Sequence, residues 1–251
     1  MVKAKLSTVL SGVLIMLTLI ACNQPRNQGL TRQVEELDSM VYNYPKFVFN
    51  SLEQLKSNEV SRYNRAYIDL VQTIAVYNIG REIQSDSMIT RAVGEFARHP
   101  ENHPENYRRS LIYQGIIRFR IGITDSRAYL PLKDALKMDE TENKLDLRSR
   151  FFANYYLGII HNKNNNVNQA HDYFRQALLL AETLNDRDML FITYRDMYLN
   201  RMKALDFLTA KTLLETLQSY PCDSEEKIRD VKNAEAMFYN SQKRYRNAMK
   251  L

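Results

Sequence analysis

Two segments of the chain, NYYLGIIH at residues 154–161 and AHDYFRQA at residues 170–177, decide its fold class. Both place small and bulky side chains at helical spacing, at Leu157, Gly158, His161, Ala170, Phe174 and Ala177. Small residues let two helices approach closely, and a large residue fills the space beside them. We therefore expect two helices, near residues 147–163 and 166–184, that pack against each other.

The same alternation continues on both sides of this pair. From Val34 onward, segments with helical periodicity alternate with short breaks that carry Pro, Gly, Asn, Asp or Ser. Further pairs are expected near residues 188–203 and 206–220, and near residues 224–241 and 244–251. Seven Gly and six Pro in 251 residues are few for a protein built of strands and tight turns. The sequence therefore predicts an all-α fold of about five to six antiparallel helix pairs over residues 33–251.

Small residues recur near the start of each expected second helix, at Ala92, Ala128, Ala170, Ala210 and Ala248. Their separations are 36, 42, 40 and 38 residues. Similar intervals between equivalent residues are typical of a repeat protein, in which each unit buries its apolar face against the next unit. The intervals therefore favour one array of stacked helix pairs.

Prolines and glycines give further local expectations. Pro45 is placed to open a helix, and Gly80 stands where a helix usually ends. Residues 99–106, HPENHPEN, contain two prolines and are expected to form a loop. Pro131 falls beyond the first turn of an expected helix, where it lacks a hydrogen-bond donor and crowds the preceding turn. We expect that helix either to start late or to kink there.

The six residues of the opening pair resemble, in type and spacing, the signature of the tetratricopeptide repeat (TPR). The pair departs from that signature where Asn154 replaces the usual Trp, His161 the usual Tyr and Glu182 the common closing Pro. The pair at residues 224–251 resembles the repeat less closely than the pair at 147–184. As a whole, the chain is similar to TPR lipoproteins of Gram-negative bacteria, and this resemblance implies an α-solenoid.

In the TPR family, the first helices of successive pairs line a concave groove that receives a peptide or a segment of a partner protein. That register places eight side chains of this chain toward such a groove, at Arg109, Tyr113, Phe152, Tyr155, Ile159, Asn162, Arg195 and Asn233. The Arg and Asn side chains of this set are candidates for a carboxylate clamp, if they converge. The resemblance thus implies a non-catalytic scaffold with a protein or peptide partner.

The N-terminus resembles a bacterial lipoprotein signal. Lys3 and Lys5 precede an apolar stretch, Leu6–Ala21, that ends in Leu-Ile-Ala directly before Cys22. A membrane-spanning helix needs about 20 predominantly apolar residues, whereas this stretch is shorter and contains several polar residues. We therefore expect cleavage of residues 1–21, lipidation of Cys22 by acyl chains such as palmitate, and a flexible tether over residues 22–32.

Such a lipid anchor would hold the protein at the bacterial cell envelope, since more than one acyl chain suffices for stable attachment. Asn23, rather than Asp, favours the outer membrane over the inner membrane. An ordinary signal peptide or an uncleaved signal anchor is the alternative. If Cys22 is lipidated, Cys222 has no intramolecular disulfide partner, because the chain contains only these two cysteines.

Motifs of known catalytic sites are missing from the sequence. It contains no Walker loop, dinucleotide-binding glycine pattern, HExxH, GxSxG or paired CxxC. His99 and His103 lie close together beside two glutamates, but the prolines between them prevent one helix face from presenting both to a metal. The net charge of +6 is too small to indicate a nucleic-acid partner. We therefore expect no enzymatic activity, no cofactor and no metal.

Two other functions stay open. The array is the periplasmic input half of a longer regulator if the natural chain continues past Leu251 with an apolar run of about 20 residues. Glycan capture is less favoured, because the chain has no Trp, the usual flat platform for sugars. Because solenoids need a polar terminal cap, residues 244–251 either serve as a minimal cap or precede further repeats.

Overall fold

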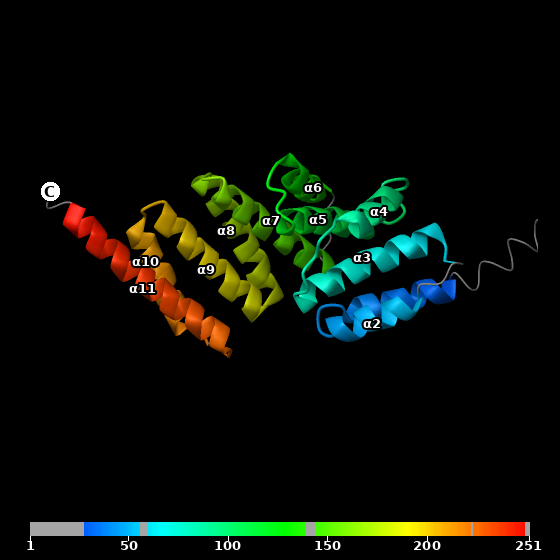
Figure 1. Ribbon diagram of the computed structural model, residues 1–251, viewed down its shortest axis with the longest axis horizontal. Helices are drawn as coiled ribbons and strands as arrows, with labels where there is room; N and C mark the ends of the chain where they lie inside the picture. Colours follow the sequence, from blue (N-terminus) through cyan, green and yellow to red (C-terminus); the bar gives the residue numbers. More distant parts are fainter. Residues whose placement is uncertain (1–27, 56–59, 139–143, 222, 249–251) are drawn as a thin grey trace, which may run out of the picture. The chain divides into compact units, whose positions relative to one another are not determined.

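The computed structural model describes residues 28–55, 60–138, 144–221 and 223–248 (Figure 1). All regular secondary structure in these residues is helical, and none of them lies in a β-strand. The chain separates into two compact units, unit 1 up to Ile117 and unit 2 from Arg118 onward. The prediction of an all-α fold is confirmed for this part of the chain.

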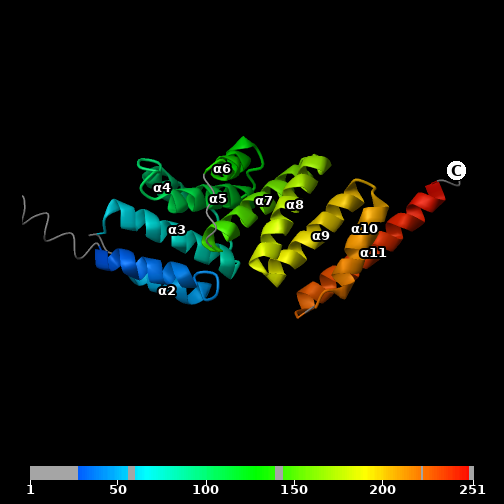
Figure 2. The same cartoon turned by 180° about the vertical axis from the view of Figure 1, so that it is seen from behind.

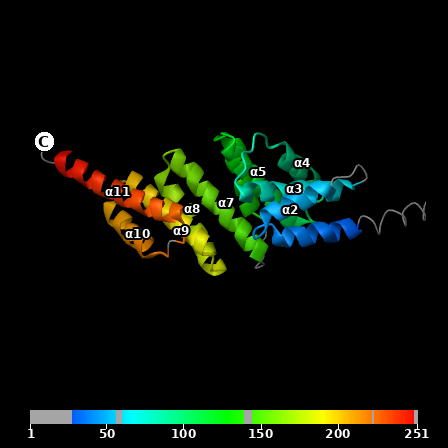
Figure 3. The same cartoon turned by 60° about the horizontal axis from the view of Figure 1, so that its bottom comes forward.

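The described helices of unit 1 are residues 28–40, α2 (Pro45–Leu55), α3 (Arg62–Ile79), α4 (Ser87–Phe96) and α5 (Pro104–Arg120), whose last turn belongs to unit 2. Helix α2 packs against α3, and α3 packs against α4 (Figure 3). The Ser61 hydroxyl accepts a hydrogen bond from the backbone N–H of Asn64 at the start of α3. Gly80 follows the end of α3 with a φ of 76°, a conformation that favours glycine. Pro45 and Gly80 thus occupy the helix boundaries that the sequence predicts.

The described helices of unit 2 are α6 (Ser126–Leu136), α7 (Lys144–Lys163), α8 (Val167–Leu184), α9 (Arg187–Lys203), α10 (Phe207–Ser219) and α11 (Glu225–Ala248). Each of them packs against the next helix along the chain (Figure 2). In addition, α7 contacts α9, and α9 contacts α11. The first helices of successive pairs in unit 2 are therefore neighbours.

The ends of the array differ from the sequence-based expectation. Helix α11 is continuous, whereas a pair with a break between residues 241 and 244 was expected. The residues at the expected break, Gln242 and Lys243, are good helix formers, so nothing local ends the helix there. Ala248 is consequently the last residue of α11 and does not begin a second helix. At the other end, residues 28–32, assigned above to the tether, are helical.

Two proline positions also differ from the expectation. Helix α5 begins at Pro104, inside the stretch expected to be a loop, because a proline is tolerated in the first helical turn. Helix α6 begins at Ser126 rather than late, and the Asp125 carboxylate accepts the backbone N–H of Arg127 at 2.9 Å. Pro131 lies buried inside this helix.

In the part of the chain that the structure describes, no helix combines the length and the apolar character that crossing a bilayer requires. The predicted signal peptide, residues 1–21, and the predicted lipidation site, Cys22, lie outside the described residues.

Candidate functional site

The interface between α7 and α8 is built on a close approach at Gly158. A Cβ atom added to this glycine would lie 2.6 Å from Cδ1 and from Cε1 of the Phe174 ring, which is too close for a real contact. Leu157, Ala170, Phe174 and Ala177 are fully buried around it. The small residue on α7 thus allows the aromatic side chain of α8 to lie directly against the helix backbone.

His161 occupies the outer part of the same interface. Its ring stacks on Tyr173 of α8, with ring centroids 5.3 Å apart and an interplanar angle of 13°. Burial lowers the pKa of His161, and the nearby positive charge of Lys133 lowers it further. The neutral imidazole therefore packs as an aromatic ring, in the role that the usual Tyr of the motif would have.

A chain of polar side chains connects the first helices of unit 2. The Tyr155 hydroxyl on α7 donates a hydrogen bond to the Asp196 carboxylate on α9. Arg195 donates from Nε to Asp196 Oδ1 at 3.2 Å, and from Nη1 to Asp230 Oδ2 on α11 at 2.8 Å. We call the surface that carries this chain the α7–α9–α11 face, made of Tyr155, Ile159, Asn162, Arg195, Asp196, Asp230 and Asn233.

Further hydrogen bonds join the same helices. Asn200 on α9 donates from Nδ2 to Asn162 Oδ1 on α7 at 3.1 Å, and the Lys203 ammonium donates to the backbone carbonyl of Asn162. The Tyr198 hydroxyl donates to the backbone carbonyl of Ala234 on α11 at 2.6 Å. The partners are 36 to 41 residues apart in the sequence. This separation matches the interval between the recurring alanines.

The charges on the face are paired. The Asp196 and Asp230 carboxylates hold the pKa of Arg195 above its ordinary value, although burial alone would lower it. Burial, followed by the Asp196 charge, raises the pKa of Tyr155 well above its ordinary value. At neutral pH, Arg195 is therefore cationic and Tyr155 neutral. The centre of the face therefore presents hydrogen-bonding groups and one carboxylate charge in excess of the Arg195 charge.

The structure brings only part of the predicted groove set onto this face. Ile159, Asn162 and Arg195 are half-buried and Asn233 is exposed. Tyr155 belongs to the face through the hydrogen bond of its hydroxyl to Asp196, although its side chain is buried, and Phe152 is buried outside the face. The other two residues of the set, Arg109 and Tyr113, belong to unit 1 and are 1% and 0% exposed. Arg109 is buried and paired with Asp38, so it is not available for a carboxylate clamp.

Arg109 does not face a groove as predicted, because it forms a buried ion pair with Asp38. Its Nη1 and Nη2 atoms each lie 2.6 Å from a carboxylate oxygen, and the Tyr67 hydroxyl donates to the same carboxylate at 2.9 Å. Burial lowers the pKa of Arg109, but the Asp38 charge outweighs it, so that the pKa lies well above its ordinary value. Sequence reasoning did not identify Asp38. The sequence nevertheless contains an indication that Asp38 is buried. It lies four residues after Val34 and three before Val41, so helical spacing puts it on the same apolar side as these two buried valines.

Within the described ranges, no group of three or more His, Cys, Asp or Glu side chains is arranged to hold a metal ion. No protein-family model matches the chain, and no curated protein sequence matches it.

Proposed function

We propose that this protein is a non-catalytic scaffold, held at the cell envelope by a lipid on Cys22, that binds a segment of a partner polypeptide along a TPR-like array. The proposal assigns the binding to the α7–α9–α11 face of unit 2. Its array consists of the pairs α7–α8 and α9–α10 followed by α11.

The observation that supports this most strongly is the regular spacing of the polar contacts between first helices. Tyr155 and Asp196 are 41 residues apart, Arg195 and Asp230 are 35 apart, and Arg148 and Asp186 are 38 apart. Contacts that recur at nearly constant separation are expected when equivalent helices of successive repeats lie side by side. Repeat arrays of this kind use the surface of one helix set to bind extended partners.

The chemistry of the face favours a polypeptide main chain as ligand. Asn162 and Asn233 carry amides, which donate and accept hydrogen bonds, and Ile159 provides an apolar side chain three residues before Asn162 on the same helix. The Arg195 guanidinium and its two carboxylate partners leave one negative charge in excess, so the face has little long-range attraction for an anionic ligand. A peptide backbone requires alternating donors and acceptors and only few charges.

Site-specific photo-crosslinking tests this assignment. A photoreactive residue replaces Ile159 or Asn233 on the face in the full chain, expressed in its native envelope. The matched controls replace Gln176 on α8 and Gln218 on α10, which are exposed on the second helices. One polypeptide should crosslink from both face positions and from neither control. Equal yields at all four positions, or no product at any, would contradict the proposal.

The envelope attachment is tested separately through Cys22. Replacement of this cysteine by serine removes the acyl acceptor, so the protein should move from the membrane to the soluble fraction. A Cys222→Ser variant is the control and should stay with the membrane. Membrane association of the Cys22→Ser protein would show that acylation is not the anchor.

A further inference from the structure

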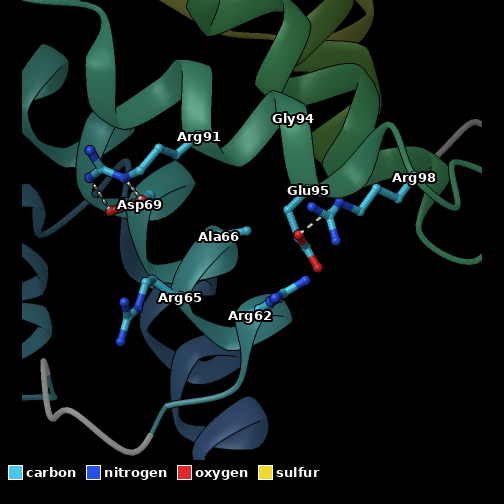
Figure 4. Close-up of a pocket in the computed structure, with 8 residues that line it drawn as sticks. All are labelled: Arg62, Arg65, Ala66, Asp69, Arg91, Gly94, Glu95 and Arg98. Atoms are coloured by element: carbon cyan, nitrogen blue, oxygen red, sulfur yellow. Dashed lines mark hydrogen bonds and ion pairs between the residues drawn. The ribbon is translucent and has the colours of Figure 1, made fainter.

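An open pocket lies between α3 and α4 in unit 1. Its volume is about 360 Å³, within the range of small-ligand sites. It is lined by Arg62, Arg65, Ala66, Asp69, Arg91, Gly94, Glu95 and Arg98 (Figure 4). Half of these lining residues are arginines, and they come from two helices that pack against each other.

The acidic residues of the pocket neutralise only two of its arginines. Arg91 donates from Nε and Nη2 to the two carboxylate oxygens of Asp69 at 3.1 and 3.3 Å, and Arg98 Nε lies 3.4 Å from Glu95 Oε2. Both pairs are marked by dashed lines in Figure 4. Arg62 and Arg65 are exposed, and no acidic partner of either guanidinium occurs among the residues described here. The lining thus carries two positive charges in excess.

Gly94 provides a second, independent observation. It lies inside α4, although glycine is among the least favourable residues in a helix interior. A Cβ atom at this position would meet nothing within 4 Å, so packing does not require a glycine here. The missing side chain leaves the α4 side of the pocket open. A bulkier residue would extend into the space beside the arginines.

We propose that this pocket binds a phosphate group, either as inorganic phosphate or as a phosphate monoester. A dianion balances the two excess charges, which a single carboxylate does not. Each guanidinium presents paired N–H donors that match phosphate oxygens, and Arg62 and Arg65 have theirs available. Arg91 and Arg98 lie at the same opening and add to the positive potential. The site is independent of the polypeptide-binding face and belongs to the other unit.

Calorimetric titration of the full chain with inorganic phosphate is the first test. The double variant Arg62→Gln/Arg65→Gln should weaken binding by about tenfold or more, because it removes the two unpaired guanidinium groups. The matched control is Arg229→Gln/Lys232→Gln on α11, which removes two exposed charges at the same spacing. This control should bind within about twofold of the unmodified chain. Equal losses in both variants would overturn the proposal. A failure to bind inorganic phosphate would overturn it if the two monoesters described below are not bound either.

A steric test leaves all four arginines in place. Gly94→Leu should fill the pocket and weaken phosphate binding, whereas Gly94→Ala adds one methyl group and should retain most of it. Circular dichroism of both variants verifies that the helices are intact. Unchanged binding by a folded Gly94→Leu protein would place the phosphate elsewhere and contradict the site.

Two further arms distinguish the sources of the phosphate. Glycerol 3-phosphate supplies a free monoester, and phosphatidylcholine vesicles with phosphatidic acid supply the same group on a lipid. Binding that depends on Arg62 and Arg65 in the first arm identifies a soluble ligand, and such binding only in the second arm identifies a lipid headgroup. Either result supports the site. Binding in neither arm, or binding that the Arg62→Gln/Arg65→Gln variant retains, overturns it.

Discussion

The two units differ in how they bury polar groups. Unit 1 places the Asp38–Arg109 ion pair in its interior, between residues 71 positions apart in the sequence. In unit 2, the polar contacts lie between neighbouring first helices, and the α7–α8 interface depends on Gly158 and Phe174. Unit 2 therefore repeats a local arrangement, whereas the buried ion pair of unit 1 is an individual long-range contact. A repeated arrangement is visible in a sequence, and a single long-range pair is not.

The largest effect should come from breaking the buried pair of unit 1. Asp38→Leu leaves the Arg109 guanidinium buried without its counter-charge and should lower the free energy of unfolding of unit 1 by about 3–5 kcal/mol. Hydrogen-exchange mass spectrometry should localise the loss of protection to unit 1, with little change in unit 2.

The double variant Asp38→Leu/Arg109→Met sharpens this comparison. It removes both charges, so it should recover a large part of the lost stability. If the double variant is as unstable as the single one, the side-chain shapes rather than the charges hold unit 1 together.

An intermediate effect should come from matched glycine substitutions in the two units. Gly158→Ala places a methyl group against the Phe174 ring and should destabilise unit 2 by about 1–3 kcal/mol. Gly94→Ala meets open space and should stabilise unit 1 by about 0.5–1 kcal/mol, because alanine loses less backbone entropy in a helix. Urea unfolding measures both changes.

Phe174→Leu added to Gly158→Ala provides the control for this steric explanation. The smaller side chain makes room for the methyl group, so the double variant should lose less than the sum of the two single variants. Strict additivity would show that the close approach is not the cause.

The smallest effect concerns the pH dependence of unit 2. Because the pKa of His161 is lower in the folded protein than in the unfolded chain, the unfolded chain binds more protons as the pH falls below about 6.5. The free energy of unfolding should therefore decrease with falling pH until the pH is below the folded-state pKa. His161→Gln should make this decrease shallower between pH 7 and pH 5. An identical pH profile in the variant would contradict this assignment.

The sequence predicted the helices of unit 2 well where their periodicity is strong. The ends of α7 to α10 lie within three residues of the predicted ends, because each break carries a polar residue or a turn residue. The prediction of a break between residues 241 and 244 was wrong, because α11 is continuous there and no Gly or Pro lies at these positions. The spacing of apolar residues alone does not show whether a helix ends or continues while a different side of it packs against a neighbour.

The candidate sites were less predictable than the helices. Register placed Arg109 toward a ligand groove, whereas the structure buries this side chain in an ion pair with Asp38 that the sequence did not indicate. The phosphate pocket was not predicted, because Arg62 and Arg65 precede Arg91 and Arg98 by more than 20 residues and look like ordinary surface charges. Only the packing of α3 against α4 brings them to one opening.

The sequence by itself determined that the described part of the chain is helical and where the helices α7 to α10 begin and end. Helix formation depends on the spacing of apolar side chains and on the residues that begin and end a helix. Both are local features that can be identified in the sequence. Only the tertiary structure decided which charges are buried in pairs and which stay available to a ligand. Pairing depends on the distance between groups far apart in sequence, and that distance exists only once the helices have packed.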